Sequence, residues 1–172
     1  GGIDAVIIGN GYNNNSLGNY QAYLYVIKAA TGQLIASIQA GSGGTSASPN
    51  GLLNPVAVDT NGDGKADRAY AGDLKGTLWK FDLSSATEAS WTASALYATS
   101  PAQPITATPG VALHPNGGYM VAFGTGSMLD TADTTANTVH YVYGVWDGAP
   151  VANTAMMGAT PPPPHATLEE RS

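Results

Sequence analysis

Oxygen-bearing side chains recur at close intervals in one short stretch of the chain. Asp59, Asn61 and Asp63 occupy alternate positions there, and Asp67 follows them. Calcium takes about six to eight oxygen ligands, and a short loop surrounds the ion only where alternate side chains point inward. The stretch 59–67 is therefore predicted to bind Ca2+.

The backbone of the same stretch fits this prediction. Gly64 is the sixth residue, where a calcium loop turns sharply and a Cβ would be in the way. The carbonyl of Lys65 falls where a backbone oxygen is supplied, so its side chain is free to face water. The predicted ligands are Asp59, Asn61, Asp63, Lys65 and Asp67. Without a cation, the three carboxylates are expected to repel one another.

The stretch starts like an EF-hand loop but ends differently. Its twelfth position is Tyr70, where a bidentate Glu would be required, so Asp67 is expected to close the site. Residues 55–58 and 68–71 on either side are apolar and β-prone, which predicts a strand, a nine-residue loop and a second strand. A plain hairpin turn would explain the Asn-Gly and Asp-Gly pairs. It would not explain the regular spacing of the oxygen ligands.

The amino-acid composition indicates the fold class of the protein that contains this loop. Charged residues make up only 10% of the 172 residues, while there are 22 glycines and 11 prolines. This favours a β-rich protein with many tight connections. The net charge of -6 argues against nucleic acid and anionic membranes as partners. No apolar run is long enough for a transmembrane segment, and the absence of cysteine excludes disulfides and thiolate chemistry.

The chain contains three similar units, and their period predicts the fold. In each unit a strand ending in glycine precedes an aromatic-rich strand. The units span residues 3–43, 54–99 and 104–148, and the aromatic-rich strands lie at 23–27, 77–81 and 140–146. Repeats of about 40 to 50 residues with several short strands are typical of β-propeller blades. We therefore predict an all-β fold with at least ten antiparallel strands, almost no helix, and the aromatic-rich strands at equivalent positions.

About three blades are too few for a closed ring, which takes about four to eight. Residues 1–148 are predicted to form a partial propeller, with the rest of a larger, about seven-bladed ring or another chain covering its open edges. Residues 149–172 include four consecutive prolines and are predicted to be an insertion or a tail.

Several distinctive motifs occur in a fixed order along the chain. They are Gly9-Asn10-Gly11-Tyr12-Asn13, the loop 59–67, the segment 70–83, Gln103-Pro104-Ile105-Thr106, Phe123-Gly124-Thr125-Gly126 and Tyr143-Gly144-Val145-Trp146-Asp147. This set resembles one known family, the C-terminal β-propeller of the PilY/PilC-type proteins of bacterial type IV pili. The resemblance covers residues 3–147, and the calcium loop followed by Ala-Gly-Asp-Leu is its most specific part.

The resemblance implies a non-enzymatic module of a large exported protein that serves pilus assembly and the pilus tip. In that family a calcium loop influences pilus extension against retraction, and many members promote surface adhesion. The implied partners are pilins or minor pilins, the rest of the propeller, and a host or abiotic surface. The implied location is the cell surface or pilus tip, with an outer-membrane or periplasmic stage in transit. The family's N-terminal adhesion region is absent here, so no adhesive specificity is assigned.

Two other functions remain open on the sequence. Residues 24–34 resemble the repeat of quinoprotein dehydrogenases, which would make the chain part of an oxidoreductase, although no motif supplies its aspartate base or central metal. Alternatively, the chain is a structural scaffold and calcium only stabilises its fold. Two further sets of side chains are predicted to have no binding role. The tryptophans are expected to pack in the core rather than form a sugar platform; they are Trp79, Trp91 and Trp146. The histidines are expected to bind no metal; they are His114, His140 and His165.

Overall fold

The computed structural model describes residues 2–12, 19–100, 102–129, 131, 133–134 and 138–148. These residues form ten strands and one 3-10 turn, Glu88–Ser90. Every strand pair is antiparallel. The predicted all-β fold is confirmed, whereas the predicted tail 149–172 lies outside the described residues.

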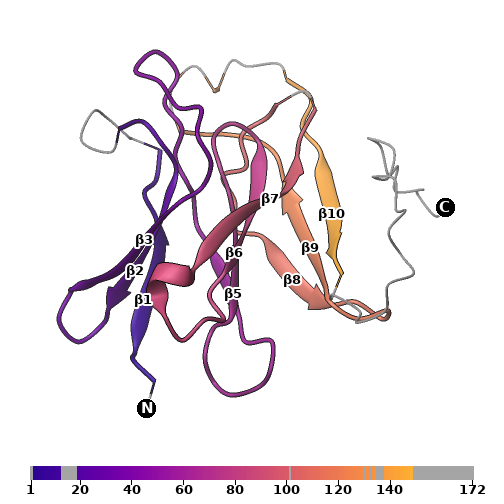
Figure 1. Cartoon of the computed structure of the whole chain (residues 1–172). Coiled ribbons are helices and arrows are strands. Elements are labelled where there is room, and N and C mark those ends of the chain that lie inside the picture. The colour runs from indigo at the N-terminus through magenta and orange to yellow at the C-terminus, as the bar shows by residue number, and fades with distance from the viewer. Residues whose placement is uncertain are drawn as a thin grey trace.

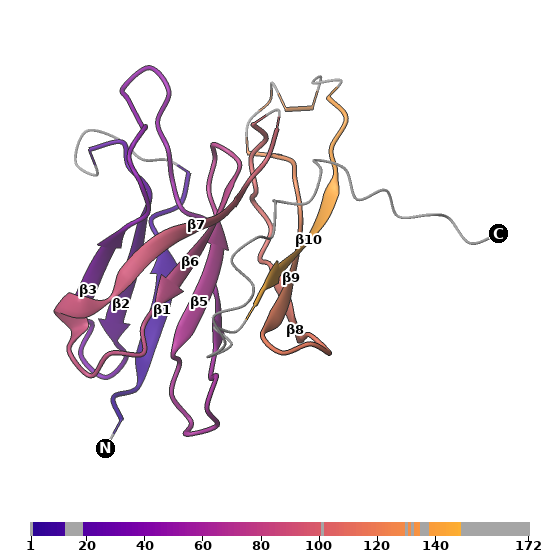
Figure 2. The same cartoon turned by 45° about the vertical axis from the view of Figure 1, so that its right-hand side comes forward.

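The strands form three sheets that follow one another along the chain (Figures 1 and 2). The first sheet contains β1 (Ala5–Gly9), β2 (Tyr23–Lys28) and β3 (Leu34–Gln39). The central sheet contains β4 (Val56–Val58), β5 (Arg68–Gly72), β6 (Thr77–Asp82) and β7 (Thr92–Ala98). The third sheet contains β8 (Gly110–Leu113), β9 (Tyr119–Gly124) and β10 (Val142–Asp147). Strand order within each sheet is sequence order, because each connection joins neighbouring strands.

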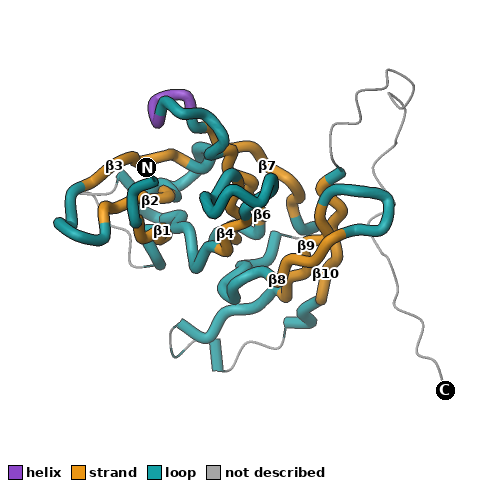
Figure 3. The backbone as a smooth tube through the Cα atoms, turned by 90° about the horizontal axis from the view of Figure 1, so that it is seen from below, coloured by secondary structure: helices purple, strands orange, loops and turns teal. Residues whose placement is uncertain are grey.

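The central sheet lies between the other two and is buried on both faces, and the three sheets form an arc (Figure 3). Side chains alternate between faces along a strand. On β5, Ala69 and Ala71 therefore face the first sheet and contribute to a core with Leu24 and Phe81. Tyr70 faces the third sheet and contributes to a second core. This second core also contains Leu78, Ile105, Val121 and Phe123.

The outer faces of the first and third sheets carry exposed apolar side chains. Val6 and Ile8 are 47% and 40% exposed, since the inner face of β1 is the one that carries Ile7. On β10, Val142 and Trp146 are 70% and 49% exposed. Within the described residues no further sheet packs against either face. That residues 1–148 are part of a larger ring with open edges stays a prediction.

The three aromatic-rich strands occupy equivalent positions, as predicted. β2 pairs with the glycine-ended strand β1, β6 pairs with β5, and β10 pairs with β9. The central and third sheets each have one strand before this pair, β4 and β8. In the central sheet one more strand, β7, follows the pair, as β3 does in the first sheet.

The residue after each strand-ending glycine repeats one set of hydrogen bonds. These residues are Asn10, Asp73 and Thr125. Each of them exchanges two hydrogen bonds with one residue of the chain. Its backbone N–H donates to the carbonyl of that residue, and its side-chain oxygen accepts the N–H of the same residue. The partners are Tyr23, Thr77 and Tyr141, respectively. Each side chain also bonds to a segment that joins two sheets: to the N–H of Leu52, to the Asn50 amide and to the Gln103 amide. The three different side chains thus all bind a joining segment, Asn10 and Asp73 as hydrogen-bond acceptors and Thr125 as a donor.

One prediction about the tryptophans is wrong. Trp79 and Trp91 pack against the first core, as expected. Trp146 instead lies half-exposed on the third sheet, where its ring stacks on His114 at 4.7 Å between centroids and its Nε1 donates to the carbonyl of Gly117. Its recurring position indicated burial, but in the described part of the chain no sheet covers the face that it occupies.

Candidate calcium site

The candidate loop connects β4 to β5 at one end of the central sheet (Figure 2). Its neck is closed by the pairing of Val58 with Arg68 and by a 3.0 Å hydrogen bond from the Asp67 N–H to the Val58 carbonyl. The Asp67 carbonyl accepts from the N–H of Leu83 at 2.8 Å. Asp67 is therefore fixed to the strands on both sides, and the predicted strand, nine-residue loop and strand are confirmed in the fold.

Asp59 organises the first half of the loop. Its carboxylate accepts the backbone N–H groups of Gly62 at 2.6 Å, Gly64 at 2.7 Å and Asn61 at 3.1 Å. These hydrogen bonds, chiefly those from Gly64 and Gly62, lower the pKa of Asp59 below its ordinary value. The loop is thus folded around a carboxylate that is ionised at neutral pH.

Gly64 has the positive backbone angle that the sharp turn requires, with φ of +84°. A Cβ built at this position would have no neighbour within 4 Å. The glycine is needed for its backbone conformation and not, as the sequence suggested, because a Cβ would meet another atom.

Asp67 joins the two ends of the loop. Its carboxylate accepts the N–H of Thr60 at 2.8 Å and the Thr60 hydroxyl at 2.7 Å. The Asn61 amide donates to its other oxygen at 3.4 Å. Asp67 therefore contacts the first residues of the loop from its last position, and its role as the closing ligand stays a prediction.

Lys65 and Asp63 form an exposed ion pair of 3.0 Å. The sequence predicted that the Lys65 side chain would face water. In the structure it is exposed but also contacts Asp63. Its hydrogen bonds lower the pKa of Asp63, although the charge of Asp59 acts in the opposite direction. The expected repulsion among the carboxylates is present but is outweighed by the loop's own donors.

The donor chemistry fits a hard cation. Every predicted ligand atom is an oxygen, and Asp59 and Asp63 favour their ionised forms. Among the described residues, no three Asp, Glu, His or Cys side chains are already grouped as a metal site. The carboxylates instead hold the loop's N–H groups, so a bound ion would have to draw them together.

A second polar cluster joins the central and third sheets. The sequence did not indicate this cluster. Asp147, at the end of β10, is 4% exposed. It accepts hydrogen bonds from Arg68 Nη1 at 3.0 Å, the Tyr70 hydroxyl at 2.7 Å and Lys80 Nζ at 2.9 Å. Burial, together with the bond to Asp147, raises the pKa of Tyr70. The Tyr-Gly-Val-Trp-Asp motif contained this residue, but nothing local to it indicates partners from another sheet.

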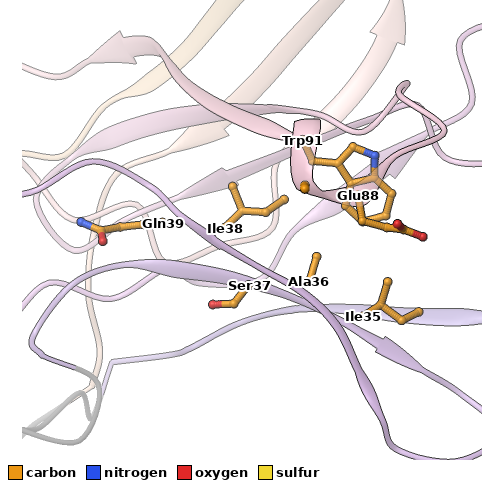
Figure 4. Close-up of a pocket in the computed structure, with 8 residues that line it drawn as sticks. Ile35, Ala36, Ser37, Ile38, Gln39, Glu88 and Trp91 are labelled. Atoms are coloured by element: carbon orange, nitrogen blue, oxygen red, sulfur yellow. The ribbon is translucent and has the colours of Figure 1, made fainter.

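A groove runs between β3 and the 3-10 turn (Figure 4). The residues of β3 from 35 to 39 form one side, and Glu88, Ala89 and Trp91 form the other. Glu88 is its one ionisable lining residue. A general acid and base pair needs two positioned groups, so the lining of this groove does not form one.

None of the described residues belongs to a helix with the length and hydropathy of a membrane span.

Comparisons with known proteins extend the structural evidence. The family model described as the PilY1 beta-propeller domain matches residues 1–92 and 88–161. A type IV pilus biogenesis factor PilY1 homolog from Xylella fastidiosa is 38% identical over 168 residues, which cover 86% of this chain and 11% of that protein. The type IV pilus biogenesis factor PilY1 of Pseudomonas aeruginosa is 35% identical over 195 residues, covering 98% and 16%.

The crystal structure of the Pseudomonas aeruginosa PilY1 C-terminal domain matches with a TM-score of 0.72 and 39% identity, over 83% of this chain and 34% of that chain. Together with this match, the successive antiparallel sheets of the chain show that its class is the β-propellers. Within that class, the chain belongs to the PilY1 β-propeller domain family. It spans only about a tenth to a sixth of the length of these curated relatives.

Proposed function

We propose that this chain is a non-enzymatic, calcium-binding propeller module of a type IV pilus biogenesis and tip adhesin protein. The observation that carries the proposal is the loop 59–67, whose oxygen donors are held by a closed hairpin neck within a PilY1-type propeller. The ligands that we propose are Asp59, Asn61, Asp63, the carbonyl of Lys65 and Asp67.

Calcium suits this loop better than magnesium. Calcium accepts an irregular shell of about six to eight oxygens, whereas magnesium demands a small octahedron and dehydrates reluctantly. Three carboxylates bring three negative charges to the divalent ion. The ammonium of Lys65, now 3.0 Å from Asp63, would give up that contact when the ion binds.

The relatives' names supply the biological setting of the proposal. They are type IV pilus biogenesis factors, and we extend that role to the protein that contains this module. Calcium occupancy of the loop would then influence pilus extension against retraction and surface adhesion. The partners would be pilins or minor pilins, the rest of the propeller, and a host or abiotic surface. The location would be the cell surface or the pilus tip, reached through the periplasm.

The proposal is tested in cells with the full-length protein. Asp67→Ala removes the closing ligand, while Asp82→Ala removes an exposed carboxylate of β6 that lies outside the loop. We expect Asp67→Ala to change the number of surface pili at an unchanged level of the protein, and Asp82→Ala to leave the number unchanged. If Asp67→Ala abolished calcium binding without changing piliation, calcium would be only a structural staple.

A further inference from the structure

Asp67 and Arg68 connect the candidate calcium loop to the junction between the central and third sheets. Asp67 directs its carboxylate to Thr60 inside the loop. The next residue, Arg68, directs its guanidinium to Asp147 on the third sheet at a distance of 3.0 Å. Consecutive residues of an extended strand point to opposite sides. The two contacts therefore depend on the same short piece of backbone.

That piece of backbone is held firmly. The Asp67 N–H bonds to Val58 on β4, and the Asp67 carbonyl bonds to Leu83 directly after the end of β6. Arg68 pairs in register with Val58 on one side and with Asp82 on the other. The backbone between Asp67 and Arg68 therefore has little freedom to move. A change in the direction of one side chain is expected to change the direction of the other.

The far end of the connection is anchored as well. The Asp147 side chain is 5% exposed, and that of Arg68 is 23% exposed. Tyr70 and Lys80 hold the same carboxylate at 2.7 Å and 2.9 Å, and the guanidinium carbon of Arg68 lies 6.0 Å from the centre of the Tyr119 ring. Arg68 is thus held between two residues of the third sheet, both outside the loop.

We propose that Arg68 is a positioning residue for the calcium loop, which couples calcium binding to the junction of the central and third sheets. This inference rests on the proposed calcium site. The ion pair with Asp147 orders the backbone at Asp67 before calcium arrives, and a ligand already held in its bound conformation binds more tightly. By reciprocity, bound calcium strengthens the ion pair by the same factor.

Plain electrostatics makes the opposite prediction. Arg68 is a cation beside an acidic loop, so its removal should strengthen calcium binding if only charge mattered. Asp82, across from Arg68 in the sheet, and Asp147 are the anions that face it. Lys80 provides a matched control, because it is a second cation on the same Asp147 carboxylate but lies on β6, away from the loop.

The test measures calcium affinity of the full chain by competition with a chromophoric chelator. We expect Arg68→Met to weaken calcium binding about fivefold, the low end of typical couplings between sites. Arg68→Lys, which can still pair with Asp147, should recover most of this loss. Lys80→Met should bind calcium within about twofold of the unaltered protein, since Arg68 and Tyr70 still hold Asp147 when the charge of Lys80 is removed.

Hydrogen exchange gives a second measurement that needs no substitution. Calcium should slow exchange of the amides of β10, at residues 142–147, in the unaltered chain. Equal or tighter calcium binding by folded Arg68→Met, or no calcium effect on β10, would overturn the coupling while leaving the calcium site intact. No calcium binding by the unaltered chain would overturn both the site and the coupling.

Discussion

Asp59 and Asp67 have different tasks in the candidate loop. Asp59 accepts three backbone N–H groups and so sets the path of the first six residues. Asp67 ties the end of the loop to Thr60. Both sets of contacts are made between residues of the loop itself. Calcium binding would require the oxygens of these carboxylates to converge on the ion.

The pKa directions of Asp59 and Asp63 predict how calcium binding depends on pH. Both lie below 3.8 in the folded chain. The ionised forms therefore contribute stability above pH 3.8, and that contribution is lost as the pH falls through the lowered values. We expect constant calcium affinity from about pH 8 to about pH 5 and a steep loss below about pH 4.

Calorimetric titration at each pH measures this dependence, with circular dichroism as the check that the chain remains folded. A loss of affinity between neutral pH and about pH 5 would mean that a loop carboxylate has a raised pKa, contrary to its hydrogen bonding.

At the scale of elements, the β4–β5 hairpin depends on one glycine conformation. Gly64→Ala should lower the free energy of unfolding by about 1 kcal/mol, because a residue with a Cβ is disfavoured at positive φ. Gly110→Ala is the matched control, since Gly110 has no positive φ and its nearest contact to an added Cβ is 3.9 Å. Urea denaturation compares the two, and equal stability would show that the loop relaxes freely.

The junction of β5, β6 and β10 should be more sensitive to charge than the surface. Asp147→Asn keeps the shape of the side chain but removes the anion that Arg68 and Lys80 both contact, so we expect a loss of about 2 kcal/mol. Asp82→Asn changes the corresponding residue of β6, which is exposed and bonds to Ser84, and should cost under about 0.5 kcal/mol. Similar costs in urea denaturation would contradict a special role for Asp147.

The hairpin could be predicted from the sequence because its signals are local. The β-prone residues 55–58 and 68–71 stand directly beside the spaced oxygens of the loop. The cluster around Asp147 could not, because its partners lie 67 to 79 residues away and meet only when two sheets stack. The repeat of Asn10, Asp73 and Thr125 is not visible as a sequence motif, because three residue types perform one task. Its signal was their common position, directly after a strand-ending glycine.

At the scale of the whole molecule, the central sheet is the only one of the three described sheets that is covered on both faces. The first and third sheets expose Val6, Ile8, Val142 and Trp146 on their outer faces. These are sheet faces, and a propeller blade has such faces covered by its neighbours. In a larger propeller, neighbouring blades would cover these faces.

The isolated chain should therefore self-associate. We expect its sedimentation coefficient to rise with concentration, and Ile8→Lys to reduce this rise by placing a charge on the outer face of the first sheet. Thr87→Lys adds the same charge at an exposed position before the 3-10 turn and should have little effect. A chain that stays monomeric at all concentrations would show that the exposed faces need no cover.

The central claim is that residues 59–67 form a calcium site, and calorimetric titration of the folded chain with calcium tests it most directly. We predict binding of one ion, a melting temperature that rises with free calcium, weak competition by magnesium, and the largest loss of affinity among the loop variants in Asp67→Ala. Absence of binding up to millimolar calcium, with an unchanged melting temperature, would contradict the account and leave the loop as only a turn.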